Sequence, residues 1–191
     1  MILNQEFDFN RDAPKHVKDA FKSPPRKVLL TSGEKLFRIL TPAELFELRS
    51  QAGRQDVKLD PNEVGQWWMT QKTFSRLVEV SKHQGKDLSN VVRESLAISR
   101  DFSSRMNALC IIQLKRNLYG FEGLAAPQPL SAKDPDEMLT GNAEQVWIPR
   151  MSWNDVFLVR FLTSFRAIDL VDLSPHVTAT LGDILRAKKR V

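Results

Sequence analysis

The sequence lacks the residue patterns that support metal, thiol or phosphate-loop chemistry. Its three histidines, His16, His83 and His176, are far apart and do not form the H-E-x-x-H spacing of a zinc site. No G-x-S-x-G nucleophile elbow, Walker motif or G-x-G-x-x-G loop occurs. We therefore expect no metal and no glycine-rich phosphate loop, and a chemistry that needs few ionisable groups.

Cysteine and long hydrophobic runs are also scarce. Cys110 is the single cysteine and lies in an apolar run, so no internal disulfide is possible and we expect a buried, unreactive thiol. No stretch approaches the ~18 apolar residues of a membrane span, and residues 1–6 do not have the pattern of a signal peptide. We expect action in a cytoplasm, or secretion by a non-classical route into a target-cell cytoplasm.

The composition is that of an ordinary globular domain. The chain has 191 residues, 42% of them hydrophobic and 27% charged, with a net charge of +5. Basic residues cluster near both ends, where they would bind nucleic acid, acidic lipid or an acidic partner, or be merely solvated. The basic residues concerned are Lys15, Lys18, Lys22, Arg26, Lys27, Arg186, Lys188, Lys189 and Arg190.

The order of local patterns predicts a short N-terminal arm, residues 1–27, followed by one domain over residues 28–191. Within the domain, Thr41-Pro42-Ala43-Glu44 has the arrangement of a capping box directly after a strand, and so predicts a short helix there. Residues 120–143, rich in glycine and proline, are expected to form a long loop. Helices are predicted at 17–21, 74–78, 88–102 and 181–187, and strands at 28–30, 36–40, 108–115, 145–149 and 156–161.

Three segments, in this order along the chain, resemble bacterial toxin domains of the ADP-ribosyltransferase fold. Residues 36–45, which contain Arg38, are similar to the first strand of those domains and the short helix that follows it. Gly65-Gln66-Trp67-Trp68-Met69-Thr70 is similar to the glycine, aromatic pair and hydroxyl residue of their second block. Residues 143–149 resemble the late strand written E-x-E-V-x-I-P in arginine-specific transferases.

This resemblance implies an α+β fold with split mixed or antiparallel β-sheets flanked by helices, and it implies NAD as the substrate. Arg38 would make bidentate contacts to the phosphates, and Trp67 or Trp68 would stack on a planar ring. Gln145 would orient the nicotinamide ribose while the glycosidic bond lengthens, so that catalysis depends on positioning and electrostatics. Thr70 belongs to the same candidate NAD-binding set.

One position departs from the transferase pattern. Gln145 stands where the E-x-E pattern has its catalytic glutamate, and an amide neither stabilises positive charge as a carboxylate does nor deprotonates an acceptor. Strand alternation places Glu144 on the opposite side, although a shift of one residue in register would make Glu144 catalytic instead. We therefore expect NAD glycohydrolase activity or an atypical transferase, rather than an arginine-specific transferase.

Each candidate residue also has an ordinary structural explanation. Arg38 would form an ion pair at the end of a strand, the tryptophans would anchor the core, and Gln145 would be an unremarkable strand residue. Tyr119 would line the same NAD-binding cleft or belong to a solvated turn. These alternatives stay open from the sequence alone.

The leading functional hypothesis is an NAD-consuming, toxin-like effector that hydrolyses NAD or transfers ADP-ribose to a macromolecule. Its partners would be NAD, a protein acceptor and an immunity or inhibitor protein. The alternatives are a non-catalytic basic protein that binds nucleic acid or a protein partner, and a degenerate member of the same fold without turnover. Nucleic acid is the second choice, and binding to it through the basic termini would weaken steeply with salt.

Overall fold

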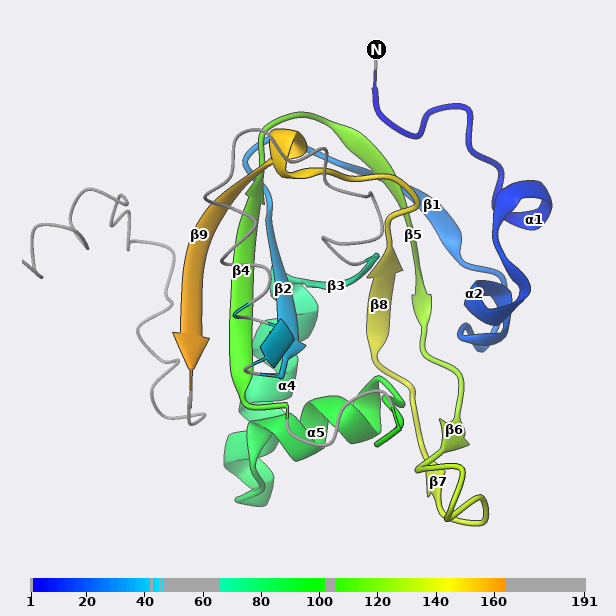
Figure 1. The fold of residues 1–191 in the computed structure, drawn as a ribbon, viewed down its shortest axis with the longest axis vertical. Coiled ribbons are helices and arrows are strands. Elements are labelled where there is room, and N and C mark those ends of the chain that lie inside the picture. The colour runs from blue at the N-terminus through cyan, green and yellow to red at the C-terminus, as the bar shows by residue number, and fades with distance from the viewer. Residues whose placement is uncertain (1, 42, 45, 47–65, 102–105, 164–191) are drawn as a thin grey trace, which may run out of the picture.

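The computed structural model describes residues 2–41, 43–44, 46, 66–101 and 106–163. Within them the predicted α+β fold is confirmed, with an antiparallel sheet and four helices (Figure 1). In chain order the elements are α1 (Phe9–Asp12), α2 (Lys15–Asp19), β1 (Arg26–Leu30), β2 (Lys35–Leu40), β3 (Trp67–Thr70), α4 (Gln71–Gln84), α5 (Leu88–Ser95), β4 (Ala108–Leu114), β5 (Leu118–Leu124), β6 (Gln128–Pro129), β7 (Met138–Leu139), β8 (Glu144–Trp147), the 3-10 turn η1 (Trp153–Asp155) and β9 (Val156–Thr163).

Seven strands form one curled sheet in the order β1-β5-β8-β3-β2-β4-β9, and each neighbouring pair is antiparallel. The short strand β3 joins two groups of strands, pairing with β2 through Met69 and Thr70 and with β8 through Trp67 and Trp68. Strands β6 and β7 form a separate two-stranded ribbon. The curl leaves β2, β4 and β9 on one side of β3 and β1, β5 and β8 on the other (Figure 1).

Strands β2, β4 and β9 with helices α4 and α5 make up the helix-backed half. Helix α4 begins at the N-cap Thr70, whose hydroxyl accepts from the Thr73 N–H, and ends at Gly85 in the left-handed region with φ +61°. The apolar faces of both helices pack on Phe37, Ile39 and alternate residues of β4. The two predicted helices are thus confirmed, but α5 ends at Ser95. The prediction extended too far, because Ala97 adopts φ +50° and breaks the helical path.

Strands β1, β5 and β8 with residues 2–25 make up the arm-backed half, and residues 2–25 are called the N-terminal arm below. The arm covers this part of the sheet with apolar side chains. Phe9, Val17 and Phe21 pack with Phe121 and Trp147 in one buried cluster. Figure 1 shows α1 and α2 beside β1 and β5. The sequence pattern predicted only one arm helix, and α1 was missed because it has four residues.

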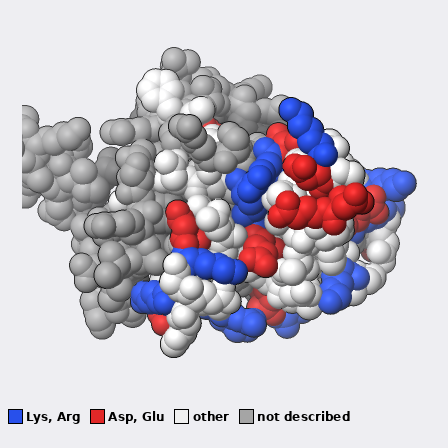
Figure 2. Space-filling view, turned by 90° about the horizontal axis from the view of Figure 1, so that it is seen from below, with Lys and Arg blue, Asp and Glu red and all other residues white. Residues whose placement is uncertain are grey.

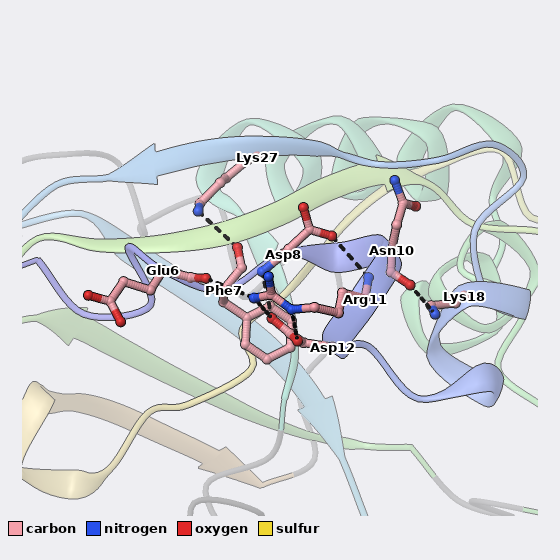
Figure 3. A network of polar contacts seen from close by, with 8 residues as sticks. All are labelled: Glu6, Phe7, Asp8, Asn10, Arg11, Asp12, Lys18 and Lys27. Carbon is pink, nitrogen blue, oxygen red and sulfur yellow. Dashed lines mark hydrogen bonds and ion pairs between the residues drawn. The ribbon is translucent and has the colours of Figure 1, made fainter.

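Polar contacts fasten the arm to itself and to the sheet. The Asp12 carboxylate accepts from the Arg11 guanidinium at 2.7 and 2.8 Å and from the Asp8 N–H at 2.8 Å (Figure 3). Lys18 Nζ donates to the Asn10 carbonyl at 2.5 Å, and Lys27 Nζ donates to the Phe7 carbonyl at 2.9 Å. Backbone bridges from Leu3 to Leu118 and from Phe21 to Ala125 complete the attachment.

The expected loop over residues 120–143 is wrong for its first part, where β5 continues to Leu124. Gly120 and Gly123, which suggested a loop, lie on β5, where a larger side chain would clash with neighbouring residues. A Cβ at Gly120 would lie 2.9 Å from Val146 Cγ1, and a Cβ at Gly123 would lie 2.9 Å from Phe21 Cδ1. Glycine here lets β8 and the N-terminal arm approach the strand.

The five predicted strands are confirmed as β1, β2, β4, β8 and β9, with ends that differ from the prediction. The capping box is also present, since the Thr41 N–H donates to Glu44 Oε2 at 2.8 Å and the Glu44 N–H donates to Thr41 Oγ1 at 3.1 Å. The helix predicted at residues 181–187 lies outside the described residues. Within the described residues no helix is long and apolar enough to cross a membrane.

Candidate functional site

A cavity of about 700 Å³ opens at the junction formed by β2, β3 and β8. Its volume lies within the ~300–1,000 Å³ that is usual for small-molecule sites. Apolar side chains from β2, β3 and α5 make up much of its wall, with a few polar groups among them. The lining residues are His16, Asp19, Ala20, Phe37, Arg38, Ile39, Glu44, Trp67, Trp68, Met69, Val92, Leu96, Ala97, Ile98, Met106, Gln128, Pro129 and Gln145.

Arg38 borders this cavity from β2 as a partly buried cation, and its register opposite Cys110 places it on the sheet face that also carries Trp68. Its side chain is 25% exposed, and its Nη2 lies 3.9 Å from Glu44 Oε1. Burial lowers the pKa of the guanidinium, while the Glu44 carboxylate raises it. Because an arginine begins from a very high pKa, the group stays protonated at neutral pH. Arg38 therefore offers a positive charge and planar N–H donors to an anionic ligand.

Cys110 pairs with Arg38 in the register of β2 and β4. It is fully buried, and burial raises the pKa of its thiol to about 12, although the nearby guanidinium lowers it. The thiol is therefore protonated at neutral pH and is no nucleophile. The prediction that Cys110 is buried is confirmed.

Gln145 enters the cavity from β8 and is 7% exposed. Its Nε2 donates to the Ala20 carbonyl at 2.9 Å, and the same carbonyl accepts from the Ala126 N–H at 3.0 Å. Since a carbonyl only accepts, this contact determines which end of the amide faces the arm. The Gln145 Oε1 makes no hydrogen bond to the described part of the chain, so it is the end available to a ligand.

The two tryptophans of β3 differ in their surroundings. Trp68 is 2% exposed and belongs to the core cluster with Leu36, Cys110 and Val146. Trp67 is partly exposed and lies 5.3 Å from the Phe21 ring, centroid to centroid. Both line the cavity, but only the Trp67 ring has exposed area on which a planar ligand could stack.

Three of the predicted site residues do not line this cavity. Thr70 caps α4, and Tyr119 lies on β5 with Lys27 Nζ 5.0 Å from its ring centroid. Glu144 forms an ion pair with Lys72 at 3.5 Å. Strand alternation places Glu144 on the face of β8 that carries Val146, which packs with Trp68, and places Gln145 on the opposite face with Trp147.

The N-terminal arm supplies cavity residues that the sequence patterns did not identify. His16 and Asp19, one helical turn apart on α2, line the cavity beside Ala20. The mixture of charges and prolines in residues 1–27 predicted only an arm that packs on the domain. No local motif indicates that this segment contacts Gln145, because that contact depends on tertiary packing across 125 positions.

The basic residues near the N-terminus are largely used within the fold. Lys18 and Lys27 donate to arm carbonyls, Lys22 donates to Asn142 Oδ1 at 2.9 Å, and Arg26 forms an ion pair with Glu122. Figure 2 shows acidic and basic side chains interspersed over the described part of one face. The C-terminal basic residues, 186–190, lie outside the described residues, and nucleic-acid binding stays a prediction.

The described residues contain no group of three or more histidine, cysteine, aspartate or glutamate side chains placed to hold a metal ion.

No family model matches the sequence, and no curated protein matches it at a significant level. Two solved structures resemble the fold at low identity. Tne2 in complex with Tni2 has a TM-score of 0.46 at 10% identity, over 73% of this chain and 92% of that one. Rhs1-CT in complex with its cognate immunity protein RhsI1 has a TM-score of 0.43 at 11% identity, over 73% of this chain and 80% of that one.

Proposed function

We propose that this chain binds NAD in the cavity and cleaves the bond between nicotinamide and ribose. The single observation that supports this is that Arg38, Trp67 and Gln145, far apart in the sequence, line one cavity of about 700 Å³. A cation, an aromatic ring and a carboxamide are the groups that a pyrophosphate, a planar base and a ribose would each contact. They are also residues of the three segments that resemble the ADP-ribosyltransferase fold.

In this proposal the cavity acts by positioning the dinucleotide. Arg38 holds the phosphates by charge and bidentate hydrogen bonds. Gln145 Oε1 accepts a hydrogen bond from a ribose hydroxyl while Nε2 keeps donating to the Ala20 carbonyl. The apolar wall from α5 and β3 excludes water from the ring, which strengthens the electrostatic contacts at the reacting bond.

Hydrolysis, with water as acceptor, is the reaction we favour over transfer to a macromolecule. The residue that lines the cavity from β8 is an amide, which cannot take a proton from a protein side chain, and Glu144 on the same strand is ion-paired with Lys72 outside the cavity. An enzyme that consumes NAD would be harmful to any cell containing it. We therefore propose a toxin-like effector whose producing cell makes an inhibitor protein.

The decisive experiment is incubation of the purified chain with NAD and measurement of free nicotinamide, with and without cell extract. We expect release by the wild type and a loss of about 10²–10³-fold in kcat for Arg38→Ala and Gln145→Ala, which is typical of removing one transition-state contact. Leu29→Ala, on the exposed part of β1, is the matched control. No release above buffer would exclude the activity, and release unaffected by both cavity variants would place the site elsewhere.

Calorimetric titration with NAD separates binding from turnover. A degenerate domain would bind NAD without releasing nicotinamide, whereas a nucleic-acid-binding protein would show an affinity for DNA or RNA that falls steeply with salt. Either result would replace the present proposal.

A further inference from the structure

We propose that Asp19, on the N-terminal arm, supplies the carboxylate that β8 does not bring to the cavity lining, and that it activates the water attacking the nicotinamide ribose. This inference rests on the proposed function and assigns one of its chemical roles. Cleavage of the glycosidic bond develops positive charge on the ribose, and a nearby carboxylate stabilises that charge. The β8 residue that lines the cavity is Gln145, so within the described residues a cavity carboxylate comes from another element.

Among the described residues that line the cavity, only Asp19 and Glu44 have carboxylates. Glu44 is already engaged, since its Oε2 accepts from the Thr41 N–H at 2.8 Å and from Thr41 Oγ1 at 2.9 Å. Its Oε1 faces Arg38 at 3.9 Å. Glu44 thus helps to hold the arginine and the start of the following segment, and it is not available as a base.

Asp19 is in the opposite situation. It lies on the exposed rim of the cavity, and its carboxylate makes no hydrogen bond or ion pair with the rest of the described chain. The next residue, Ala20, accepts the Gln145 amide at 2.9 Å, so the backbone of Asp19 is held within one residue of the predicted ribose contact. Its position is set by this contact, while its functional group stays free for water or substrate.

The chemistry balances without a further reactant. The bond between ribose C1′ and the nicotinamide nitrogen breaks, and its electron pair leaves with nicotinamide, which becomes neutral. The water oxygen bonds to C1′, and the proton it loses passes to the Asp19 carboxylate and then to solvent. The products are nicotinamide, ADP-ribose and one proton.

The test compares Asp19→Asn, Asp19→Glu and Asp19→Ala with Glu6→Gln in a steady-state nicotinamide-release assay. Glu6 is the control because it is an exposed carboxylate on the same arm (Figure 3) and is not among the residues that line the cavity. We expect Asp19→Asn to lower kcat by about 10²–10⁴-fold, the usual contribution of a general base, with little change in KM. Asp19→Glu should retain part of the rate, and added formate should restore part of the Asp19→Ala rate where chloride at equal ionic strength does not.

Two results would overturn this inference alone. One is a wild type that releases nicotinamide while Asp19→Asn has unchanged kcat. The other is an equal loss in Asp19→Asn and Asp19→Glu without formate rescue, which would indicate a structural effect on the arm. A wild type without any release would overturn the proposed function, and this role with it.

Discussion

The two halves of the sheet are covered in different ways, and the cavity lies where they meet. In the helix-backed half, the covering helices follow β3 directly, and their buried side chains form a large cluster with β2 and β4. In the arm-backed half, the cover comes from residues 2–25, and its buried cluster contains only Phe9, Ala13, Val17, Phe21, Phe121 and Trp147. Arg38 belongs to the first half and Gln145 to the second.

This difference implies that the two candidate site residues depend on different parts of the chain. Arg38 is supported by strand pairing with β4 and by buried neighbours such as Cys110. Gln145 is oriented by the carbonyl of Ala20, which belongs to the arm. Less buried apolar area makes the arm the less stable unit of the two, so local opening should disturb Gln145 before it disturbs Arg38.

The largest expected effect comes from deleting one phenylalanine ring in each half. Phe74→Ala removes a ring stacked on Phe37 at 4.5 Å, and Phe9→Ala removes a ring that contacts Phe21 and Phe121. Each deletion should cost about 3–5 kcal/mol of packing free energy. We expect Phe74→Ala to lower the free energy of global unfolding, and Phe9→Ala to release mainly the arm.

Amide hydrogen exchange distinguishes these outcomes. In Phe9→Ala, faster exchange should be confined to residues 2–25 and the edge of β5, and nicotinamide release should fall. An equal loss of protection in both halves for both variants would show that the sheet and the arm unfold as one unit.

The next effect concerns the position where the transferase pattern has glutamate. Gln145→Glu places a second acceptor against the Ala20 carbonyl, so one hydrogen bond is lost and repulsion is added. We expect a loss of about 1–3 kcal/mol in stability and no gain in nicotinamide release. The measurements are a thermal melt and the release assay.

Gln128→Glu is the control for this substitution, because Gln128 lines the same cavity and its amide makes no hydrogen bond to the described residues. It should leave stability unchanged. A Gln145→Glu variant with higher activity and an unchanged melt would contradict the role we assign to the arm.

The helix-backed half was largely predictable from the sequence, for a physical reason. Its signals are local: the apolar spacing of Phe74, Leu77 and Val78, the caps at Thr70 and Gly85, and the apolar run of β4. Each of these depends on residues a few positions apart, so a pattern in the sequence reports them directly.

The arm-backed half was less predictable because its determinants are long-range. Gly120 and Gly123 indicated a loop, although they allow close contacts with β8 and the arm. At the site, the resemblance indicated Arg38, Trp67, Trp68 and Gln145, which line one cavity, and also Thr70 and Glu144, which do not. The same resemblance did not indicate the arm residues. Ala20 and Gln145 are 125 positions apart, and no local sequence pattern predicts a contact over that separation.

A smaller effect is expected at the contact between β5 and the arm. In Gly123→Ala the new Cβ would lie 2.9 Å from Phe21 Cδ1 and 3.1 Å from Pro25 Cβ, so the arm must move. We expect a cost of about 1–3 kcal/mol for this overpacking, together with slower nicotinamide release.

Gly85→Ala is the matched comparison in the helix-backed half. Nothing lies within 4 Å of its Cβ position, so its cost of about 1–2 kcal/mol comes only from the φ of +61°. Melting temperature should fall in both variants, but activity per folded molecule should fall only in Gly123→Ala. Equal activities would mean that displacement of the arm at β5 does not reach the cavity.

The smallest expected effect is a dependence of arm docking on acid pH. Hydrogen bonds from Arg11 and from the Asp8 N–H lower the pKa of Asp12 to about 2. Because the unfolded value is higher, about 3.9, this carboxylate stabilises the arm above about pH 4, and the contribution is lost as the pH falls towards 2. The site is exposed, so the contribution is small and is weakened further by salt. The protection factors of the Asp8 and Arg11 amides, corrected for the intrinsic pH dependence of exchange, should fall between pH 4 and 2 in the wild type. Asp12→Asn should lack this step, and Glu6→Gln should keep it. A step that survives in Asp12→Asn would assign the acid sensitivity of the arm to another group.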